Sequence, residues 1–261
     1  DWRRFAGQLV RSVIAMVSAR TWAMLANRVL DAKIDARNPR TKNRAIPAGR
    51  LSMRAALAAM AVCAAGFIAV CLAFGAFFGN WWPTILGVPV LAWIGAYGWF
   101  KRFSALCHVY LGSSLAISPL AAAIAIDPAS LSGQPALWLL AVMVLCWVAG
   151  FDVIYALQDV AIDRKEGLHS MPARFGESRA LWISRTLHAI AATCLIAIVL
   201  IDPRLNLIFA LGVAVVIALL LYEHATVARW GTTKIALAFF TLNGLISCLL
   251  GTLGIVDVLV N

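Results

Sequence analysis

Three oxygen-bearing side chains near the start of the chain are spaced for one face of a helix. Asn27, Asp31 and Asp35 stand at i, i+4 and i+8, so an α-helix would place them within an arc of about 80°. Carboxylate and amide oxygens favour Mg²⁺, which takes one or two carboxylates and completes its coordination with water and substrate phosphates. This cluster therefore predicts part of a magnesium site for a phosphorylated substrate.

A second acidic cluster occurs later in the chain. It consists of Asp152, Tyr155, Asp159 and Asp163, which share a similar arc if the helix is a continuous α-helix. Carboxylates at the edge of a bilayer are costly unless they are paired or bind a metal, which favours a functional role for both clusters facing one cavity. The alternative, strongest for Asp35 and Asp163, is that solvated helix ends carry charges which adjacent basic residues neutralise.

Basic side chains surround both clusters and would attract a diphosphate carried between two metal ions. The residues expected to bind this substrate are Lys101, Arg102, Lys165 and Arg28. Most other cations are explained by the excess of Lys and Arg in cytoplasmic loops, which requires no substrate. Of the four histidines, only His169 is predicted to lie near this chemistry.

The composition is that of a membrane protein. Of the 261 residues, 62% are hydrophobic and 13% are charged, compared with about 45–50% and about 25% in soluble domains. Eight apolar runs are long enough to cross a bilayer as helices. They lie near 5–30, 55–79, 82–100, 104–126, 135–157, 179–201, 204–222 and 233–256. Because no strict polar and apolar alternation occurs and no linker interrupts the runs, residues 1–261 are predicted to form a single all-α membrane domain.

The distribution of charge predicts the orientation in the membrane. The net charge is +10, and the basic residues gather in connections near 31–54, 101–102, 164–179 and 229–234. These loops should be cytoplasmic, so both acidic clusters should lie at cytoplasmic helix ends. The first run would enter from the outer side with several arginines, so we expect that an N-terminal first helix is missing. The lipid bilayer explains this charge pattern, and neither a nucleic acid nor a protein partner is expected.

Two long segments and a short loop resemble motifs of the UbiA superfamily of intramembrane aromatic prenyltransferases. Residues 27–52 read NRVLDAKIDARNPRTKNRAIPAGRLS and resemble its first aspartate-rich motif. Residues 152–176 read DVIYALQDVAIDRKEGLHSMPARFG and resemble its second motif. Tyr97 with Lys101 and Arg102 resembles the basic loop between them. The resemblance covers essentially the whole chain and implies a polytopic helical bundle of the UbiA type, with eight transmembrane helices visible of an expected nine.

The resemblance also implies an activity. A Mg²⁺-dependent polyprenyltransferase would ionise a prenyl diphosphate, and an aromatic acid such as 4-hydroxybenzoate would attack the allylic cation during ubiquinone or menaquinone biosynthesis. The expected location is the bacterial inner membrane, with the active site facing the cytoplasm. Arg28 stands where many members carry Asp, which removes one acidic residue from the ligands of the second metal.

Residue roles follow from the same resemblance. The expected metal ligands and their neighbours are Asn27, Asp31, Asp35, Asp152, Asp159 and Asp163. Asp31 and Asp159 are expected to be essential for catalysis. Tyr155 would face the allylic cation or orient a ligand, although an aromatic anchor at the membrane interface is the alternative. Arg20 would bind the acceptor carboxylate, and its alternative is a counter-ion role toward Asp31 or Asp152.

Three other functions are compatible with parts of the pattern. An aromatic prenyltransferase of the futalosine route to menaquinone would differ in its acceptor. A transporter could use intramembrane acids, and a weak internal repeat, with Asp31 and Asp159 in corresponding positions, supports it; transporter sites, however, lie on broken helices near the midplane. A CDP-alcohol phosphotransferase requires a motif with acids three residues apart followed by Gly and Ala-Arg, which is absent.

Overall fold

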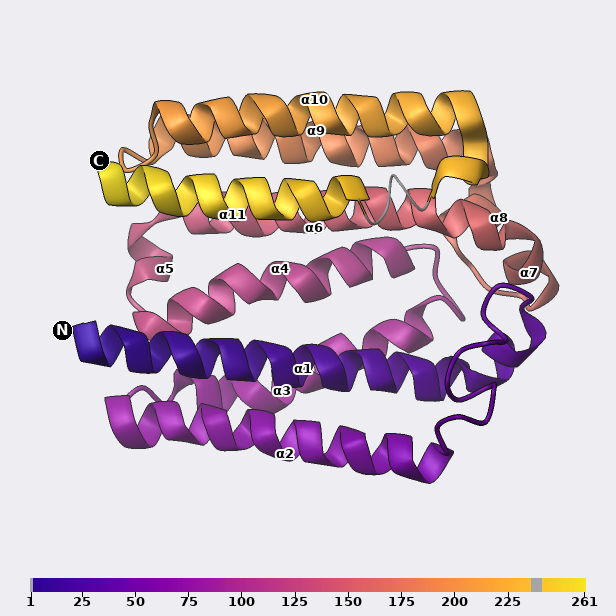
Figure 1. Ribbon diagram of the computed structural model, residues 1–261, viewed down its shortest axis with the longest axis horizontal. Helices are drawn as coiled ribbons and strands as arrows, with labels where there is room; N and C mark the ends of the chain where they lie inside the picture. The colour runs from indigo at the N-terminus through magenta and orange to yellow at the C-terminus, as the bar shows by residue number, and fades with distance from the viewer. Residues whose placement is uncertain (1, 236–240) are drawn as a thin grey trace. The chain divides into compact units, whose positions relative to one another are not determined.

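Helices are the only regular secondary structure in the described part of the chain. The computed structural model describes residues 2–235 and 241–261, which contain no β-strand (Figure 1). Eight helices among these residues are long and apolar enough to cross a membrane, as predicted. The chain divides into two compact units, one of residues 1–103 and 117–133, the other of residues 104–116 and 134–261. A single domain over residues 1–261 stays a prediction.

The first unit is built on three long helices. These are α1 (Trp2–Arg37), α2 (Met53–Phe78) and α3 (Trp82–Phe100), which pack against one another, and they are followed by the second half of α4 (Cys107–Ile126) and by α5 (Ser130–Gly133). Ser52 caps α2, since its hydroxyl accepts a hydrogen bond from the N–H of Ala55. Gln8 and Asn80 donate to carbonyls in the last turn of α4, which have no partner within that helix.

The second unit contains the first half of α4 and the rest of the chain. Its elements are α6 (Pro135–Ala156), η1 (Leu157–Asp159), α7 (Val160–Lys165), α8 (Met171–Phe175), α9 (Glu177–Ile201), α10 (Leu207–Trp230), η2 (Gly231–Lys234) and α11 (Asn243–Val260). Helices α6 and α9 pack along each other, and α10 pairs with α11. The apolar core between them includes Met143, Leu195, Val216 and Ile246.

Two predicted helix boundaries in this unit differ from the structure. The run predicted at 204–222 is a helix that continues to Trp230, because the charged Glu223 that ended the apolar run is buried inside the bundle and hydrogen-bonded. The last run was predicted at 233–256, whereas α11 extends from Asn243 to Val260. Residues 236–240 of that prediction lie outside the described residues.

Polar side chains form a cluster inside the membrane-spanning helices of the second unit. Trp147 Nε1 donates to Asn243 Oδ1 over 2.8 Å, and Asn243 Nδ2 donates to Glu223 Oε1 over 3.3 Å. His224 Nε2 lies 3.0 Å from His188 Nδ1, and His188 Nε2 lies 3.2 Å from the carbonyl oxygen of Trp147. Glu223 Oε2 accepts no hydrogen bond within the described residues. Because polar groups in a bilayer require partners, this cluster fixes α6, α9, α10 and α11 together.

Asp257 caps the helix that runs beside it. Its Oδ2 accepts hydrogen bonds from the backbone N–H groups of Asn206, over 2.5 Å, and Phe209, over 3.1 Å, at the start of α10. The side chain belongs to α11 and is fully buried. A carboxylate in this position satisfies backbone donors that have no partner within α10 and complements the positive end of the helix dipole.

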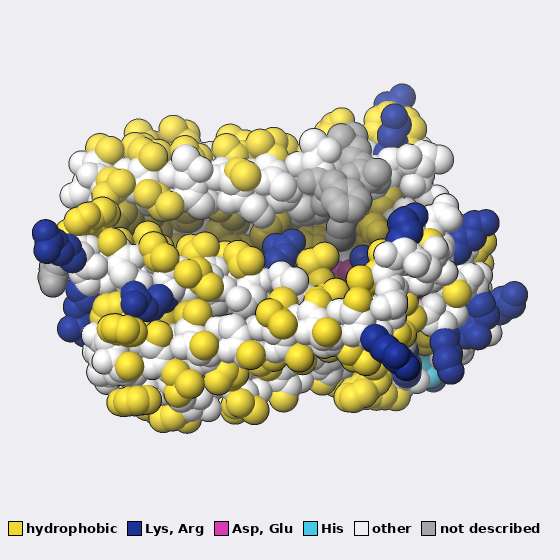
Figure 2. All heavy atoms as spheres, turned by 60° about the horizontal axis from the view of Figure 1, so that its bottom comes forward, with side chains coloured by type: hydrophobic (Ala, Val, Ile, Leu, Met, Phe, Trp, Pro, Cys, Tyr) yellow, Lys and Arg dark blue, Asp and Glu magenta, His cyan; other side chains and the backbone are white. Residues whose placement is uncertain are grey.

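The outer faces of the helices are apolar. Figure 2 shows hydrophobic side chains over most of one face, with Lys and Arg side chains mainly near the helix ends. Large side chains such as Val62, which is 71% exposed, and Leu200, which is 79% exposed, project outward from the middle or the end of their helices. Such a surface is unfavourable in water and favourable in lipid, which agrees with the predicted membrane location.

Gly112 should be essential for the approach of α4 to α6. A Cβ atom added there would overlap the carbonyl oxygen of Leu145 and lie 3.3 Å from the Cβ of Ala149. Because a backbone oxygen moves less easily than a side chain, Gly112→Ala should lower the free energy of unfolding by about 1–3 kcal/mol. The matched control is Gly251→Ala in α11, where an added Cβ meets no atom within 4 Å. Thermal unfolding in detergent measures both, and equal midpoints would contradict the close approach.

Candidate functional site

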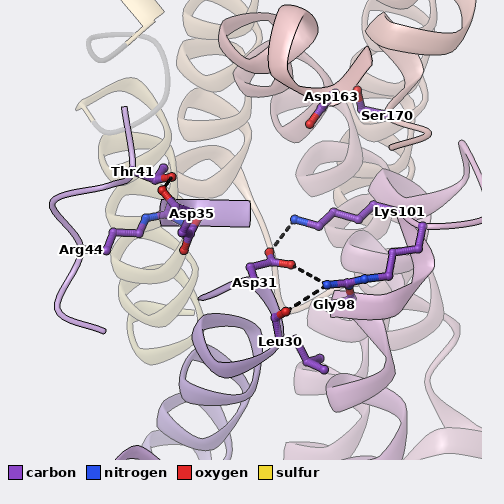
Figure 3. A network of polar contacts seen from close by, with 10 residues as sticks. Leu30, Asp31, Asp35, Thr41, Arg44, Gly98, Lys101, Asp163 and Ser170 are labelled. Atoms are coloured by element: carbon purple, nitrogen blue, oxygen red, sulfur yellow. Dashed lines mark hydrogen bonds and ion pairs between the residues drawn. The ribbon is translucent and has the colours of Figure 1, made fainter. Parts of the chain in front are cut away.

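Asp31 is held by two cations at the end of the first unit's bundle. It lies near the end of α1 and is 3% exposed. Lys101 Nζ lies 2.5 Å from its Oδ2, and Arg102 Nη2 lies 3.2 Å from its Oδ1 (Figure 3). Arg102 Nη2 also donates to the carbonyl oxygen of Leu30 over 3.0 Å. Lys101 and Arg102, which were predicted to bind substrate, thus form ion pairs with Asp31, which was predicted to bind metal. The functional roles of all three residues stay predictions.

A close approach of α3 to α1 positions these cations. A Cβ atom at Gly98 would lie 2.8 Å from Leu30 Cδ1 and 3.4 Å from Asn27 Oδ1, so only glycine fits there without displacement. The carbonyl oxygen of Gly98 accepts a hydrogen bond from Arg102 Nη1. Since α3 ends two residues later, Lys101 and Arg102 emerge beside Asp31.

Asp35 has a partner of its own. Arg44 Nη1 lies 2.7 Å from Asp35 Oδ1 and 2.9 Å from Oδ2. The hydroxyl of Thr41 donates to the carbonyl oxygen of Asp35 over 3.2 Å, which closes the basic loop back onto the end of α1. Arg44 was not among the predicted site residues. Its position in a loop of many cations gave no signal that distinguished it from its neighbours.

The first cluster has the predicted helical geometry, because Asn27, Asp31 and Asp35 all belong to α1. Asn27 and Arg28 are partly buried in the last third of this helix, whereas Arg20 is exposed. Asp31 pairs with Lys101 and Arg102, so the counter-ion role considered for Arg20 toward Asp31 is not what the structure shows. Binding of an acceptor carboxylate by Arg20 stays a prediction.

The second cluster does not lie on one continuous α-helix, so that prediction was wrong. Helix α6 ends at Ala156, Leu157–Asp159 form a 3₁₀ turn, and α7 begins at Val160. A 3₁₀ turn rotates the chain by about 120° per residue instead of 100°, which interrupts the stripe between Tyr155 and Asp159. Leu157 is buried against Ile154, Val227 and Ile235. We attribute the break to this packing, which the local pattern of acids did not reveal.

Asp163 is held by the loop that follows it. Ser170 Oγ donates to Asp163 Oδ2 over 2.5 Å, and the N–H of Leu168 donates to the carbonyl oxygen of Asp163 over 2.7 Å. Gly167 lies between them with a positive φ of 67°, a conformation that favours glycine and lets the chain turn back toward the acid. Both the side chain and the backbone of Asp163 are therefore fixed by residues within seven positions of it.

The other predicted residues of the second cluster occupy the same part of the chain. Tyr155, near the end of α6, and Asp159, the last residue of the 3₁₀ turn, are partly buried, whereas Lys165 is exposed at the end of α7. The roles of these three residues stay predictions.

Asp152 contacts a histidine that the sequence did not single out. His108 Nδ1 lies 2.7 Å from Asp152 Oδ2, and the backbone N–H of Met171 donates to His108 Nε2 over 3.2 Å. The prediction that only His169 lies near this chemistry was therefore wrong. His108 and Asp152 are 44 positions apart on different helices, so no local spacing could have related them.

The donor atoms fit a magnesium ion that is shared with a substrate. Within the described residues, no group of three or more His, Cys, Asp and Glu side chains is arranged to hold a metal by itself. Mg²⁺ nevertheless commonly takes only one or two carboxylates, with water and phosphate oxygens completing its coordination. The carboxylates of Asp31 and of Asp163 are each donors of this kind, and the chemistry of each suits an ion that arrives with a diphosphate.

Comparison with known proteins decides the family. Residues 2–245 match the UbiA prenyltransferase family. The chain belongs to this family. It is a multi-pass integral membrane protein, and the family resemblance inferred from the two acidic motifs is confirmed.

Two curated relatives in the UbiA family are described as 4-hydroxybenzoate octaprenyltransferases. The protein of Nitrosomonas eutropha is 33% identical over 169 residues, which cover 64% of this chain and 56% of the relative. The protein of Pseudoalteromonas translucida is 26% identical over 232 residues, which cover 87% of this chain and 74% of the relative. The chain thus spans just over half the length of the first of these relatives.

Solved structures of UbiA homologues share the fold. The apo structure of a homologue from Aeropyrum pernix K1 has a TM-score of 0.85 and 30% identity, and the match covers 96% of this chain and 90% of that one. A homologue from Archaeoglobus fulgidus bound to GPP and Mg²⁺ has a TM-score of 0.69 and 20% identity, with 97% and 88% covered. At that identity, the second likeness shows the fold alone.

Removal of Arg44 should destabilise the protein through Asp35. Arg44→Gln would leave a carboxylate that is only 7% exposed without its cation, at an expected cost of about 1–3 kcal/mol. Asp35→Asn in the same protein should recover part of this loss, because it removes the unpaired charge. Lys42→Gln, on the exposed surface of the same loop, is the control and should leave the unfolding midpoint unchanged. A double variant as unstable as Arg44→Gln alone would contradict the pairing.

Proposed function

We propose that this protein transfers a polyprenyl group from a prenyl diphosphate to an aromatic acid such as 4-hydroxybenzoate, in the biosynthesis of ubiquinone or menaquinone. The observation that carries this proposal is a buried carboxylate, Asp31, held by Lys101 and Arg102 at the end of a membrane bundle. Family membership and the descriptions of the relatives from Nitrosomonas eutropha and Pseudoalteromonas translucida support it. We place the active site at the cytoplasmic side of a bacterial inner membrane, in agreement with the basic loops.

The cofactor in this proposal is Mg²⁺. The homologue from Archaeoglobus fulgidus is described with GPP and Mg²⁺ bound, which supports use of this ion within the family. The residues proposed to hold it are Asn27, Asp31, Asp35, Asp152, Asp159 and Asp163. When bound, the ion neutralises negative charge on the diphosphate as it departs.

The cations of this chain bind and orient the diphosphate in this proposal. Lys101 and Arg102 are suited to this role because Asp31 fixes their head groups while their side chains remain 26% and 31% exposed, within reach of a substrate. Lys165 and Arg28 provide further positive charge. Cationic donors held in place before the reaction stabilise developing negative charge without reorganisation, which lowers the barrier to ionisation.

The remaining groups act on the organic part of the substrates. We propose that Arg20 binds the carboxylate of the aromatic acid and that Tyr155 faces the allylic cation or orients a neighbouring ligand. The apolar helices exclude water, which would otherwise capture the cation before the aromatic ring attacks it. An acceptor from the futalosine route would use the same arrangement and differ only in the contacts made to the ring.

The direct test is an assay with membranes that contain the protein. These are incubated with prenyl diphosphates of several chain lengths, a panel of aromatic acids and Mg²⁺, and the products are identified by mass spectrometry. A prenylated acid is expected, and chelation of Mg²⁺ should abolish it. If a folded protein yields no prenylated product with any acceptor, the proposed function is wrong.

Two substitutions test the proposed metal ligands. Asp31→Ala and Asp159→Ala should each lower turnover by about 100-fold or more, because each removes charge that organises the metal and the diphosphate. Asp127→Ala, an exposed acid in the connection after α4, is the control and should retain wild-type turnover. Size-exclusion profiles in detergent establish that all three variants fold. Full activity in both the Asp31 and Asp159 variants would refute the metal assignment.

A further inference from the structure

His108 uses both of its ring nitrogens inside the second unit. It lies in the first turn of α4 and is 4% exposed. Its Nδ1 lies 2.7 Å from Asp152 Oδ2 on α6, and its Nε2 lies 3.2 Å from the backbone nitrogen of Met171 at the start of α8. One imidazole ring therefore connects three helices that are separate in the sequence.

The contact with Met171 determines which nitrogen of the neutral ring carries the proton. A backbone N–H can only donate, so His108 Nε2 must be the acceptor and unprotonated. The proton then lies on Nδ1, which donates to Asp152 Oδ2. The direction of both hydrogen bonds is thus assigned from their partners. The bond from His108 Nδ1 gives the Asp152 carboxylate a fixed orientation.

The same short segment also holds the other end of the second acidic cluster. Ser170, directly before Met171, donates its hydroxyl to Asp163 Oδ2. Met171 is 4% exposed and packs with Val153 and Ala180, so the segment is anchored in an apolar cluster. Asp152 and Asp163 are thereby connected through His108, Met171 and Ser170, across the 3₁₀ break that separates them along the chain.

We propose that His108 is a positioning residue that orients Asp152 for its part in the magnesium and diphosphate site. This inference rests on the proposed function, in which Asp152 belongs to that site. Groups that hydrogen-bond to a metal-binding carboxylate fix its orientation, and their loss typically lowers metal affinity or activity by about 10- to 100-fold. His108 therefore acts through Asp152 and does not itself touch the substrate.

Two substitutions separate this role from a purely structural one. In His108→Asn, the amide nitrogen can occupy the place of Nδ1 and keep the donor to Asp152, while the contact with Met171 is lost. In His108→Gln, the longer side chain can keep an acceptor for the N–H of Met171, while the donor to Asp152 is lost. A positioning role predicts that Asn preserves function better than Gln, and an anchoring role for α8 predicts the reverse order.

The measurement is the affinity for Mn²⁺, a paramagnetic substitute for Mg²⁺, by electron paramagnetic resonance with a non-hydrolysable prenyl diphosphate analogue. His108→Gln should weaken binding by about 10- to 100-fold, and turnover should fall in parallel. The Mn²⁺ affinity of His108→Asn should remain within about threefold of the wild-type value, which is a much smaller change than the loss expected for His108→Gln. Equal affinities in both variants, or weaker binding in Asn than in Gln, would overturn the inference.

A second comparison tests whether His108 acts through Asp152. In an Asp152→Asn background, His108→Gln should cause no further loss of Mn²⁺ affinity, because the Asp152 carboxylate through which His108 acts has already been replaced. An additional loss of about tenfold in this background, the size expected for an independent contribution, would overturn the inference. His188→Gln is the matched control, since it changes another buried histidine of the same unit that bonds to a backbone carbonyl. It should lower the unfolding midpoint and leave Mn²⁺ affinity at the wild-type value.

The outcomes distinguish this inference from the proposed function. If the wild type forms a prenylated acid but the Asn and Gln variants bind Mn²⁺ equally, only the role of His108 is wrong. If the wild type forms no product but binds Mn²⁺ with the analogue, the proposed reaction is wrong, and the Asn and Gln comparison still decides the role of His108.

Discussion

Compensation of buried carboxylates is the constraint on which the rest of this structure depends. A carboxylate at the edge of a bilayer loses most of its hydration, and this loss must be offset by a cation, a hydrogen-bond donor or a metal. Asp31 receives two cations, Asp35 an arginine, Asp152 an imidazole and Asp163 a hydroxyl. Each acid and its partner lie on different helices or loops. The need to pair these acids therefore determines which loops and helix ends must lie close together.

The two units meet this constraint in different ways. In the first unit, charged partners come from the ends of helices and loops, and Gly98 brings α3 close enough to α1 for Lys101 and Arg102 to reach Asp31. In the second unit, the His108 ring contacts Asp152 and the Ser170 hydroxyl donates to Asp163, and both partners adjoin the buried start of α8. The first arrangement places positive charge beside its acids, whereas the second bonds its acids to an imidazole and a hydroxyl.

The sequence predicted what depends on local spacing and apolar length. The helix that carries Asn27, Asp31 and Asp35 followed from a repeat of four residues, and the eight apolar runs followed from the thickness of a bilayer. The 3₁₀ turn Leu157–Asp159 begins at Leu157, which is buried in a cluster with Val227 of α10 and with Ile235, and the partner of Asp152 is 44 positions away. Neither could be predicted, because tertiary contacts override the periodicity of a single segment.

The polar cluster around Glu223 has a consequence for biogenesis. Helix α10 carries Glu223 and His224 in its apolar length, and these residues bond to His188 of α9 and Asn243 of α11. A segment that enters the lipid alone would expose a glutamate there, at a cost of several kcal/mol. Because α11 is synthesised after α10, we expect α10 to remain beside the translocation machinery until Asn243 emerges, so that the last helices partition into the bilayer together.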